Sequence, residues 1–247
     1  MKIQGIRFLL IFLFVVSLNA QKETAETVID KFNKLHSGKE KIKSITSWKF
    51  STLNFNPMQK SEVPTNIYFK GDKFRVEQII SGKKEIMATD GKKYWTQSQM
   101  RNEKAQIMPE SMVPAMKEQI ARQKDALTIG PLLEYKTRKK SLQLMGLEKI
   151  NNRNHFKIKM VTKTDITLIF YIDNETYFLD RIESQIGNKD KKELLKVNFS
   201  NQKKVGDFTI AHKIEQYLGA NQISSVKINS VELNPKLDDI LFAFPKK

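Results

Sequence analysis

The sequence predicts a mostly β domain of the α+β class, with about eleven antiparallel strands and two helices. From residue 44 onward, apolar and polar residues alternate in many short segments, which is the period of strands with one buried face. Pairs of turn-forming residues that contain glycine separate several of these segments at intervals of about ten residues. Two other segments have apolar residues at helical spacing.

The first helix is expected over residues 23–36. Val28, Ile29, Phe32 and Leu35 fall on one face at helical spacing, and Gly38 stands where such a helix would end. We therefore expect one amphipathic helix before the first strand.

The first group of strands is expected to form an antiparallel meander. Its alternating apolar residues are Trp48, Phe50, Ile67, Phe69, Phe74 and Val76. Its turn signals are Gly71-Asp72, Ser81-Gly82 and Asp90-Gly91, because these residues adopt the positive φ angles of tight turns.

The second helix is expected from Pro109 to Leu127. Met112, Met116 and Ile120 share one face of it, and residues 130–131, Gly-Pro, mark its end. Proline is tolerated in the first turn of a helix, so Pro114 does not oppose this prediction. A methionine-rich face suits contact with irregular apolar partners, because methionine side chains adapt their shape.

Strand signals return in the second half of the chain, after a lysine-rich connection at residues 136–140. Residues 156–160 and 178–186 alternate, while residues 166–172, which include Leu168 and Phe170, are apolar on both faces. No repeat or low-complexity linker divides the chain, so we expect a single domain over residues 21–247 with residues 135–140 as the one plausible seam.

The first 20 residues have the layout of a secretory signal peptide. Lys2 and Arg7 precede an apolar run at residues 8–16, and a short polar segment then ends at Ala20. The run is shorter than the roughly 20 apolar residues that span a bilayer, so a retained anchor is the weaker reading. We expect cleavage after Ala20 and a periplasmic location.

Composition limits the classes of partner. The chain contains no cysteine, which excludes disulfides and thiolate metal sites. Its formal net charge is +16, and loss of residues 1–20 would lower this by two to +14. The lysines are dispersed, and export argues against nucleic acid; either they form a solvated face, or they attract an anionic membrane surface or another acidic envelope partner.

Motifs for catalysis are missing from the sequence. It contains no HExxH, no GxSxG, no phosphate-binding glycine loop and no dinucleotide fingerprint. His36, His155 and His212 are far apart in the chain, which disfavours a shared metal site. We therefore expect no catalytic residues, no metal and no cofactor.

This polar chain contains many large apolar residues, with 15 Phe, 9 Met and 2 Trp. They form either an ordinary core or the apolar face of a strongly curved sheet, covered by a mobile helix. On the second reading, the candidate ligand-binding residues are Trp48, Phe50, Ile67, Phe69, Phe74, Val76, Trp95, Met112, Met116, Ile120, Leu168 and Phe170.

The order and spacing of these segments resemble the LolA/LolB-type periplasmic lipoprotein-localisation family, the carriers of outer-membrane lipoproteins. The resemblance covers nearly all of residues 21–247 and rests on residues 27–32, 67–75, 89–95, 171–173, 178–179 and 241–245. It implies a half-open antiparallel β-barrel closed by helices around an apolar cavity. It also implies a soluble periplasmic carrier that shields the acyl chains of lipoproteins or another lipid.

One position departs from the family. The carriers have an arginine beside a proline just after the strand that matches residues 67–69, whereas this chain has Lys70 and Gly71.

An envelope sensor or interaction domain that uses the same fold to bind an acidic or lipidic partner is the alternative function. An enzyme is the least supported reading, and we expect a monomer that interacts with envelope membrane proteins or lipid.

Overall fold

The computed structural model describes residues 23–35, 41, 44–57, 60–128, 132–187 and 192–245. The signal peptide proposed for residues 1–20 lies outside them. None of the helices in these ranges is long and apolar enough to cross a membrane.

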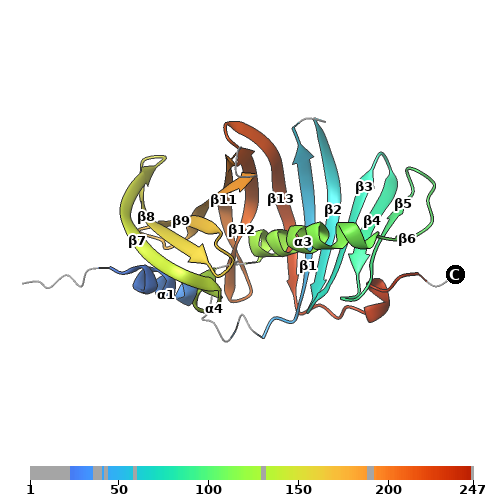
Figure 1. Cartoon of the computed structure of the whole chain (residues 1–247), viewed down its shortest axis with the longest axis horizontal. Helices are drawn as coiled ribbons and strands as arrows, with labels where there is room; N and C mark the ends of the chain where they lie inside the picture. The colour runs from blue at the N-terminus through green and yellow to red at the C-terminus, as the bar shows by residue number, and fades with distance from the viewer. Residues whose placement is uncertain are drawn as a thin grey trace, which may run out of the picture.

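All strands of the described chain belong to one antiparallel sheet (Figure 1). Its first half contains β1 (Ser47–Asn56), β2 (Ser61–Lys70), β3 (Lys73–Ile80), β4 (Lys83–Thr89), β5 (Tyr94–Ser98) and β6 (Gln106–Ile107). Its second half contains β7 (Lys139–Ile150), β8 (Arg153–Thr162), β9 (Thr167–Asp173), β10 (Leu179–Gly187), β11 (Lys192–Val205), β12 (Phe208–Leu218) and β13 (Asn221–Leu233).

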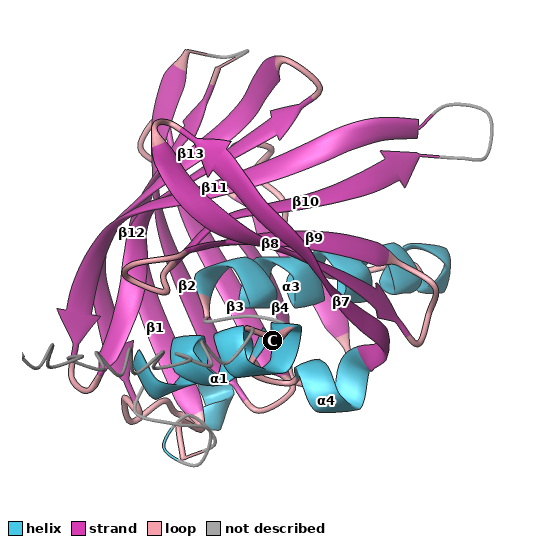
Figure 2. Cartoon of the chain, turned by 90° about the vertical axis from the view of Figure 1, so that its left-hand side faces the viewer, coloured by secondary structure: helices cyan, strands magenta, loops and turns pink. Residues whose placement is uncertain are grey.

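The strand order joins two meanders into one curved, open sheet. It runs β6-β5-β4-β3-β2-β1-β13-β12-β11-β10-β9-β8-β7, so β1 pairs with β13 in the middle and β6 and β7 are the two free edges. The sheet curls around the helices, which lie on its inner face (Figure 2). The expected fold class is confirmed, and the turns at Gly71, Gly82 and Gly91 have the positive φ that the sequence predicted.

The described residues form thirteen strands, more than the eleven expected. Strand β7 was missed from the sequence because its register shifts between Lys139 and Ser141 and again between Leu144 and Gly146, which interrupts the alternation. The lysine-rich connection expected at residues 136–140 is instead part of a short helix, α4 (Tyr135–Arg138), and the start of β7.

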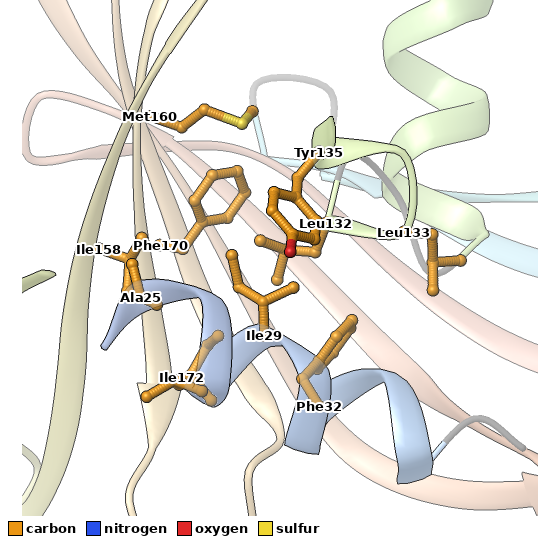
Figure 3. Packing of buried hydrophobic residues seen from close by; sticks show 11 residues of the cluster. Ala25, Ile29, Phe32, Leu132, Leu133, Tyr135, Ile158, Met160, Phe170 and Ile172 are labelled. Carbon is orange, nitrogen blue, oxygen red and sulfur yellow. The ribbon is translucent and has the colours of Figure 1, made fainter. Parts of the chain in front are cut away.

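Helix α1 (Ala25–Leu35) packs on the inner face of the sheet and contributes to the first of two apolar cores. Thr24 caps it, because its hydroxyl accepts a hydrogen bond from the amide of Thr27, whose hydroxyl accepts one from the amide of Thr24. The α1 core contains the buried side chains of Ala25, Val28, Ile29, Phe32, Leu132, Leu133, Tyr135, Ile158, Met160, Phe170 and Ile172 (Figure 3). Each large side chain buried here stabilises the fold by about 1.5–3 kcal/mol.

A second helical segment crosses the inner face from β12 towards β4 (Figure 1). It consists of the 3₁₀ turn η1 (Glu110–Met112) and α3 (Val113–Leu127), as the sequence predicted. Pro114 lies in the first turn of α3, where its missing N–H would have no helical partner in any case.

The C-terminal segment crosses the outer face of the sheet and contains the 3₁₀ turn η3 (Asp239–Leu241). Backbone carbonyl groups of this segment accept hydrogen bonds from three side chains of the sheet. Lys70 Nζ bonds Leu237 O, Arg75 Nη1 bonds Leu241 O, and Trp95 Nε1 bonds Phe242 O. We call residues 235–245 the C-terminal strap.

The strap should respond to acid through Asp239. Hydrogen bonds from Lys70 and Lys73 lower the pKa of this carboxyl from 3.8 to about 2. Because the pKa is lowered, the ion pairs of Asp239 stabilise the folded strap at pH values above the ordinary pKa of 3.8. This stabilisation is lost as the pH falls through about 2. Carbon-detected NMR titration should show this pKa, and Lys70→Met should move it back towards 3.8; an unshifted pKa in the unsubstituted protein would contradict the ion pairs.

Candidate functional site

The site is the part of the inner face between α3 and the central strands. Antiparallel register aligns the side chains of β13, β1, β2, β3 and β4 in rows that run across the sheet. The first apolar row contains Leu233, Trp48, Phe69 and Phe74, and the second contains Val231, Phe50, Ile67, Val76 and Met87. Together they form a continuous apolar floor.

Aromatic rings on this floor pack directly against one another. The rings of Trp48 and Phe50 stack with centroids 5.7 Å apart, and Phe69 meets Phe50 edge to face at 6.3 Å. Phe69 also packs against Phe74 at 5.2 Å. Such pairs contribute about 0.5–1.5 kcal/mol beyond the area that they bury.

Helix α3 covers the floor but packs loosely against it. Leu127, at its last turn, is the one residue of α3 that is fully buried. Met116 and Ile120 are half-buried, and Ile120 packs against the apolar floor. The rest of the contact surface of α3 therefore remains accessible, unlike that of α1, which buries four side chains.

Polar contacts hold α3 mainly at its C-terminal end. Asp125 forms a two-armed ion pair with Arg138 of α4, at 2.6 and 3.0 Å. Lys124 Nζ lies 3.5 Å from Gly71 O, and Lys117 Nζ lies over the ring of Tyr94, 6.0 Å from its centroid. These contacts place α3 over the end of the sheet where the first apolar row lies.

A small cavity remains at the end of α3. Its volume is about 40 Å³, and it lies between the last turn of α3, the end of α1, and strands β11 and β12. Phe32, Leu127, Phe199 and Ile210 are among its lining residues. Since one water needs about 10–15 Å³, this space holds only a few waters, and an alkyl chain would need α3 to shift outward.

The structure brings together most of the candidate residues. Seven of them belong to the second apolar core, which α3 covers and which we call the α3 core: Trp48, Phe50, Ile67, Phe69 and Phe74 are buried there, and Val76 and Ile120 pack against it. Phe170 is instead buried in the α1 core, and Leu168 packs against that core, in a different part of the inner face. Met116 lies on the half-buried side of α3.

Trp95 does not lie on this floor. Strand register places it opposite Ala88, in line with Arg75, Tyr68 and Lys49 on the outer face. Its ring packs edge to face against Phe244 of the C-terminal strap at 6.2 Å. Met112 is also outside the floor, because it belongs to η1 and its side chain is 53% exposed.

Sequence reasoning missed the part of the α3 core that comes from β11 and β12. Phe199, Phe208, Ile210 and Ile214 are buried there with Leu127. The alternation of residues 208, 210 and 214 was the available signal, but the sequence alone does not show that β12 lies one strand from β1, beyond β13.

A polar network on the outer face involves His155. Its Nε2 lies 3.0 Å from Asp180 Oδ2, and its Nδ1 donates to the carbonyl oxygen of Arg153 in the matching tautomer. Asp173, which is fully buried, lies 2.6 Å from a guanidinium nitrogen of Arg153. The ligand atoms of the histidine and the two aspartates lie within 4.8 Å of one another, as in metal sites, but Arg153 neutralises the carboxylates.

Solved structures with the same architecture identify the fold. A LolA superfamily protein from Nitrosomonas europaea superposes with a TM-score of 0.54 at 11% identity, over 90% of this chain and 98% of that one. The chain has a LolA-like fold. A DUF1329 family protein from Desulfovibrio piger gives a TM-score of 0.55 at 10% identity, over 89% and 97% of the two chains.

A third solved structure comes from Vibrio parahaemolyticus and is described as an outer membrane lipoprotein-sorting protein domain. It gives a TM-score of 0.52 at 11% identity, over 87% of this chain and 94% of that one. No protein-family model and no curated protein matches the sequence. The resemblance seen in the sequence is thus confirmed as a shared fold.

The structure also shows what replaces the family's Arg-Pro pair. Lys70 points to the outer face, where its Nζ binds Asp239 and the carbonyl oxygen of Leu237, each at 2.7 Å. Gly71 forms the turn to β3 with φ +59°. In this LolA-like chain, the position therefore anchors the C-terminal strap.

Proposed function

We propose that the protein binds the acyl chain of a lipid or lipoprotein between α3 and the apolar floor, and shuttles it across the periplasm. On this proposal residues 1–20 direct export, residues 21–247 form a single carrier domain without catalytic activity, and the protein acts as a monomer. Its dispersed positive charge would help it to approach anionic membrane surfaces.

The observation that carries this proposal is the mismatch between floor and cover. The floor presents two rows of aromatic and aliphatic side chains, whereas α3 buries one residue against them. A helix that contributes only to the core would bury more of its apolar face, as α1 does. The LolA-like fold of the lipoprotein-sorting domain supports the same reading.

Burial of an alkyl chain would supply the affinity. Each CH₂ group transferred from water contributes about 0.8 kcal/mol before the costs of association. Outward movement of α3 would open the required space, since its contacts are concentrated at Asp125 and Leu127 near one end.

Aspartate at Met116 or Ile120 should separate ligand binding from folding. Both side chains are half-buried on α3, so the new carboxylate can reach water when the helix moves outward. We expect the free energy of unfolding to fall by less than about 1 kcal/mol. Affinity for monolaurin, a neutral lauroyl ester, should drop at least about tenfold, which is about 1.4 kcal/mol.

Denaturant melts and calorimetric titrations on the same samples measure both quantities. Gln119→Asp is the matched control, because Gln119 is exposed on α3 and the same charge there should change neither. A loss of several kcal/mol in both variants would make α3 an ordinary core element, and unchanged monolaurin affinity would remove it from the site.

A further inference from the structure

A row of polar side chains lies on the inner face beside the second apolar row. It is further from α3 than the two apolar rows are. Strand register aligns Thr52, Thr65, Gln78, Glu85 and Ser98 across β1 to β5 on the inner face. We call these five residues the polar row. It lies two residues along each strand from the second apolar row, a distance of about 7 Å.

The three hydroxyl groups of the polar row are already used within the protein. Thr52 Oγ1 lies within hydrogen-bond distance of Asn54 Oδ1 and Thr65 O, and Thr65 Oγ1 donates to Val63 O. Ser98 Oγ donates to Glu85 Oε1 at 2.9 Å. Thr52, Thr65 and Ser98 are at most 2% exposed, so they leave little accessible surface for a ligand.

Gln78 and Glu85 are different, because both are half-buried and keep unused polar atoms. Among the described residues, none forms a hydrogen bond with the side-chain amide of Gln78. Both hydrogen bonds to the Glu85 carboxylate, from Ser98 Oγ and the amide of Met100, end on Oε1. Within the same ranges no lysine or arginine forms an ion pair with Glu85, whereas Glu77 on the outer face pairs with Arg75 and Lys84.

We infer that the ligand is an amphiphile whose polar end carries hydrogen-bond donors, such as an amide, hydroxyl or ammonium group, and is held by Gln78 and Glu85. This inference rests on the proposed function, because the alkyl chain must occupy the apolar floor for its polar end to reach the polar row. An anionic head is rejected, since a second negative charge beside the unpaired Glu85 carboxylate is unfavourable in a partly buried site.

The overall charge of the protein sharpens this inference. A net charge of +16, or +14 without residues 1–20, attracts anions to the molecule as a whole. A preference against an anionic head must therefore come from a local group, and Glu85 is the acidic member of the polar row.

Three amphiphiles with the same undecyl tail test the inference: laurate, N-lauroylethanolamine and dodecylammonium, in which the last carbon before the nitrogen takes the place of the carbonyl carbon. Isothermal titration calorimetry of each against the purified protein, below the micelle concentration and at physiological ionic strength, should give at least about tenfold weaker binding for laurate. Glu85→Gln should strengthen laurate binding about tenfold and weaken dodecylammonium binding at least about fivefold. Folding should survive, because the glutamine Oε1 can still accept from Ser98 and Met100.

Glu62→Gln is the matched control, since Glu62 is exposed on the outer face of β2 and its loss changes the net charge equally. Equal affinities for the three heads, or equal effects of the two substitutions on laurate, would overturn the inference while leaving acyl binding in place. Failure of all three amphiphiles to bind would overturn the proposed function and this inference with it. Tighter binding of N-lauroylethanolamine than of dodecylammonium would identify a neutral amide as the preferred donor, and the reverse order would identify an amine.

Discussion

Phe50→Ala should lower the free energy of unfolding by about 3–5 kcal/mol, the range for removal of a fully buried phenylalanine. The Phe50 side chain is 0% exposed and lies at the centre of the apolar floor. It stacks on Trp48, meets Phe69 edge to face, and pairs across the strands with Ile67 and Val231. Its neighbours Trp48, Ile67 and Phe69 are themselves buried in a close-packed core, so they can close the space only in part.

Urea denaturation followed by far-ultraviolet circular dichroism measures this change. Phe55→Ala, in the same strand, is the control, because Phe55 is only half-buried. Its loss should cost about half as much or less, since less apolar area returns to water. Equal losses in the two variants would show that the floor is not the stabilising core of β1.

Asp173→Ala should cost about 3 kcal/mol at neutral pH, because it breaks a buried, charged network. Asp173 Oδ1 accepts hydrogen bonds from the amides of Glu175 and Thr176 and from the Thr176 hydroxyl. Its Oδ2 is held by charge alone, 2.6 Å from a guanidinium nitrogen of Arg153. The substitution leaves two amides of the turn after β9 without this acceptor.

The cost of Asp173→Ala should depend on pH. Burial opposes ionisation and is the largest single influence, but the hydrogen bonds from Thr176 and Glu175 and the charge of Arg153 outweigh it and lower the pKa of Asp173. A carboxyl with a lowered pKa stabilises the fold above its ordinary pKa of about 4, and that contribution is lost as the pH falls through the folded value. The difference between the unsubstituted protein and the variant should therefore shrink from pH 7 to pH 3.

Urea melts at the two pH values provide the measurement. Glu232→Ala is the control, because Glu232 is an exposed strand residue that forms an ion pair with Lys49, and such pairs contribute less than about 1 kcal/mol. A cost for Asp173→Ala that is the same at both pH values would show that its charge does not contribute.

Local patterns were sufficient to predict α1, α3 and the hairpins of the first meander. Val28, Ile29 and Phe32 predicted the buried face of α1, and the glycine turns at 71, 82 and 91 predicted the meander from β2 to β5. These features depend on residues close in sequence, where side-chain period and allowed φ angles act directly.

Features that depend on distant segments could not be predicted in this way. Trp95 has the apolar neighbours of a floor residue, yet the C-terminal strap covers the outer face and buries it there. Leu168 and Phe170 are apolar strand residues like Phe69, but α1 covers them in place of α3. The alternation of apolar residues shows that a side chain is buried. Which segment covers that side chain depends on the topology of the whole sheet.

The pairing of β1 with β13 has a consequence for how the chain reaches this structure. The meanders β1–β6 and β7–β13 each form from neighbours in sequence, but Trp48 meets Leu233 only after nearly the whole chain is available. Closing so long a loop costs entropy before its hydrogen bonds can form, which slows folding. Until then β1 and β13 both present unpaired edges, so the chain is most prone to aggregate just before this last ladder closes.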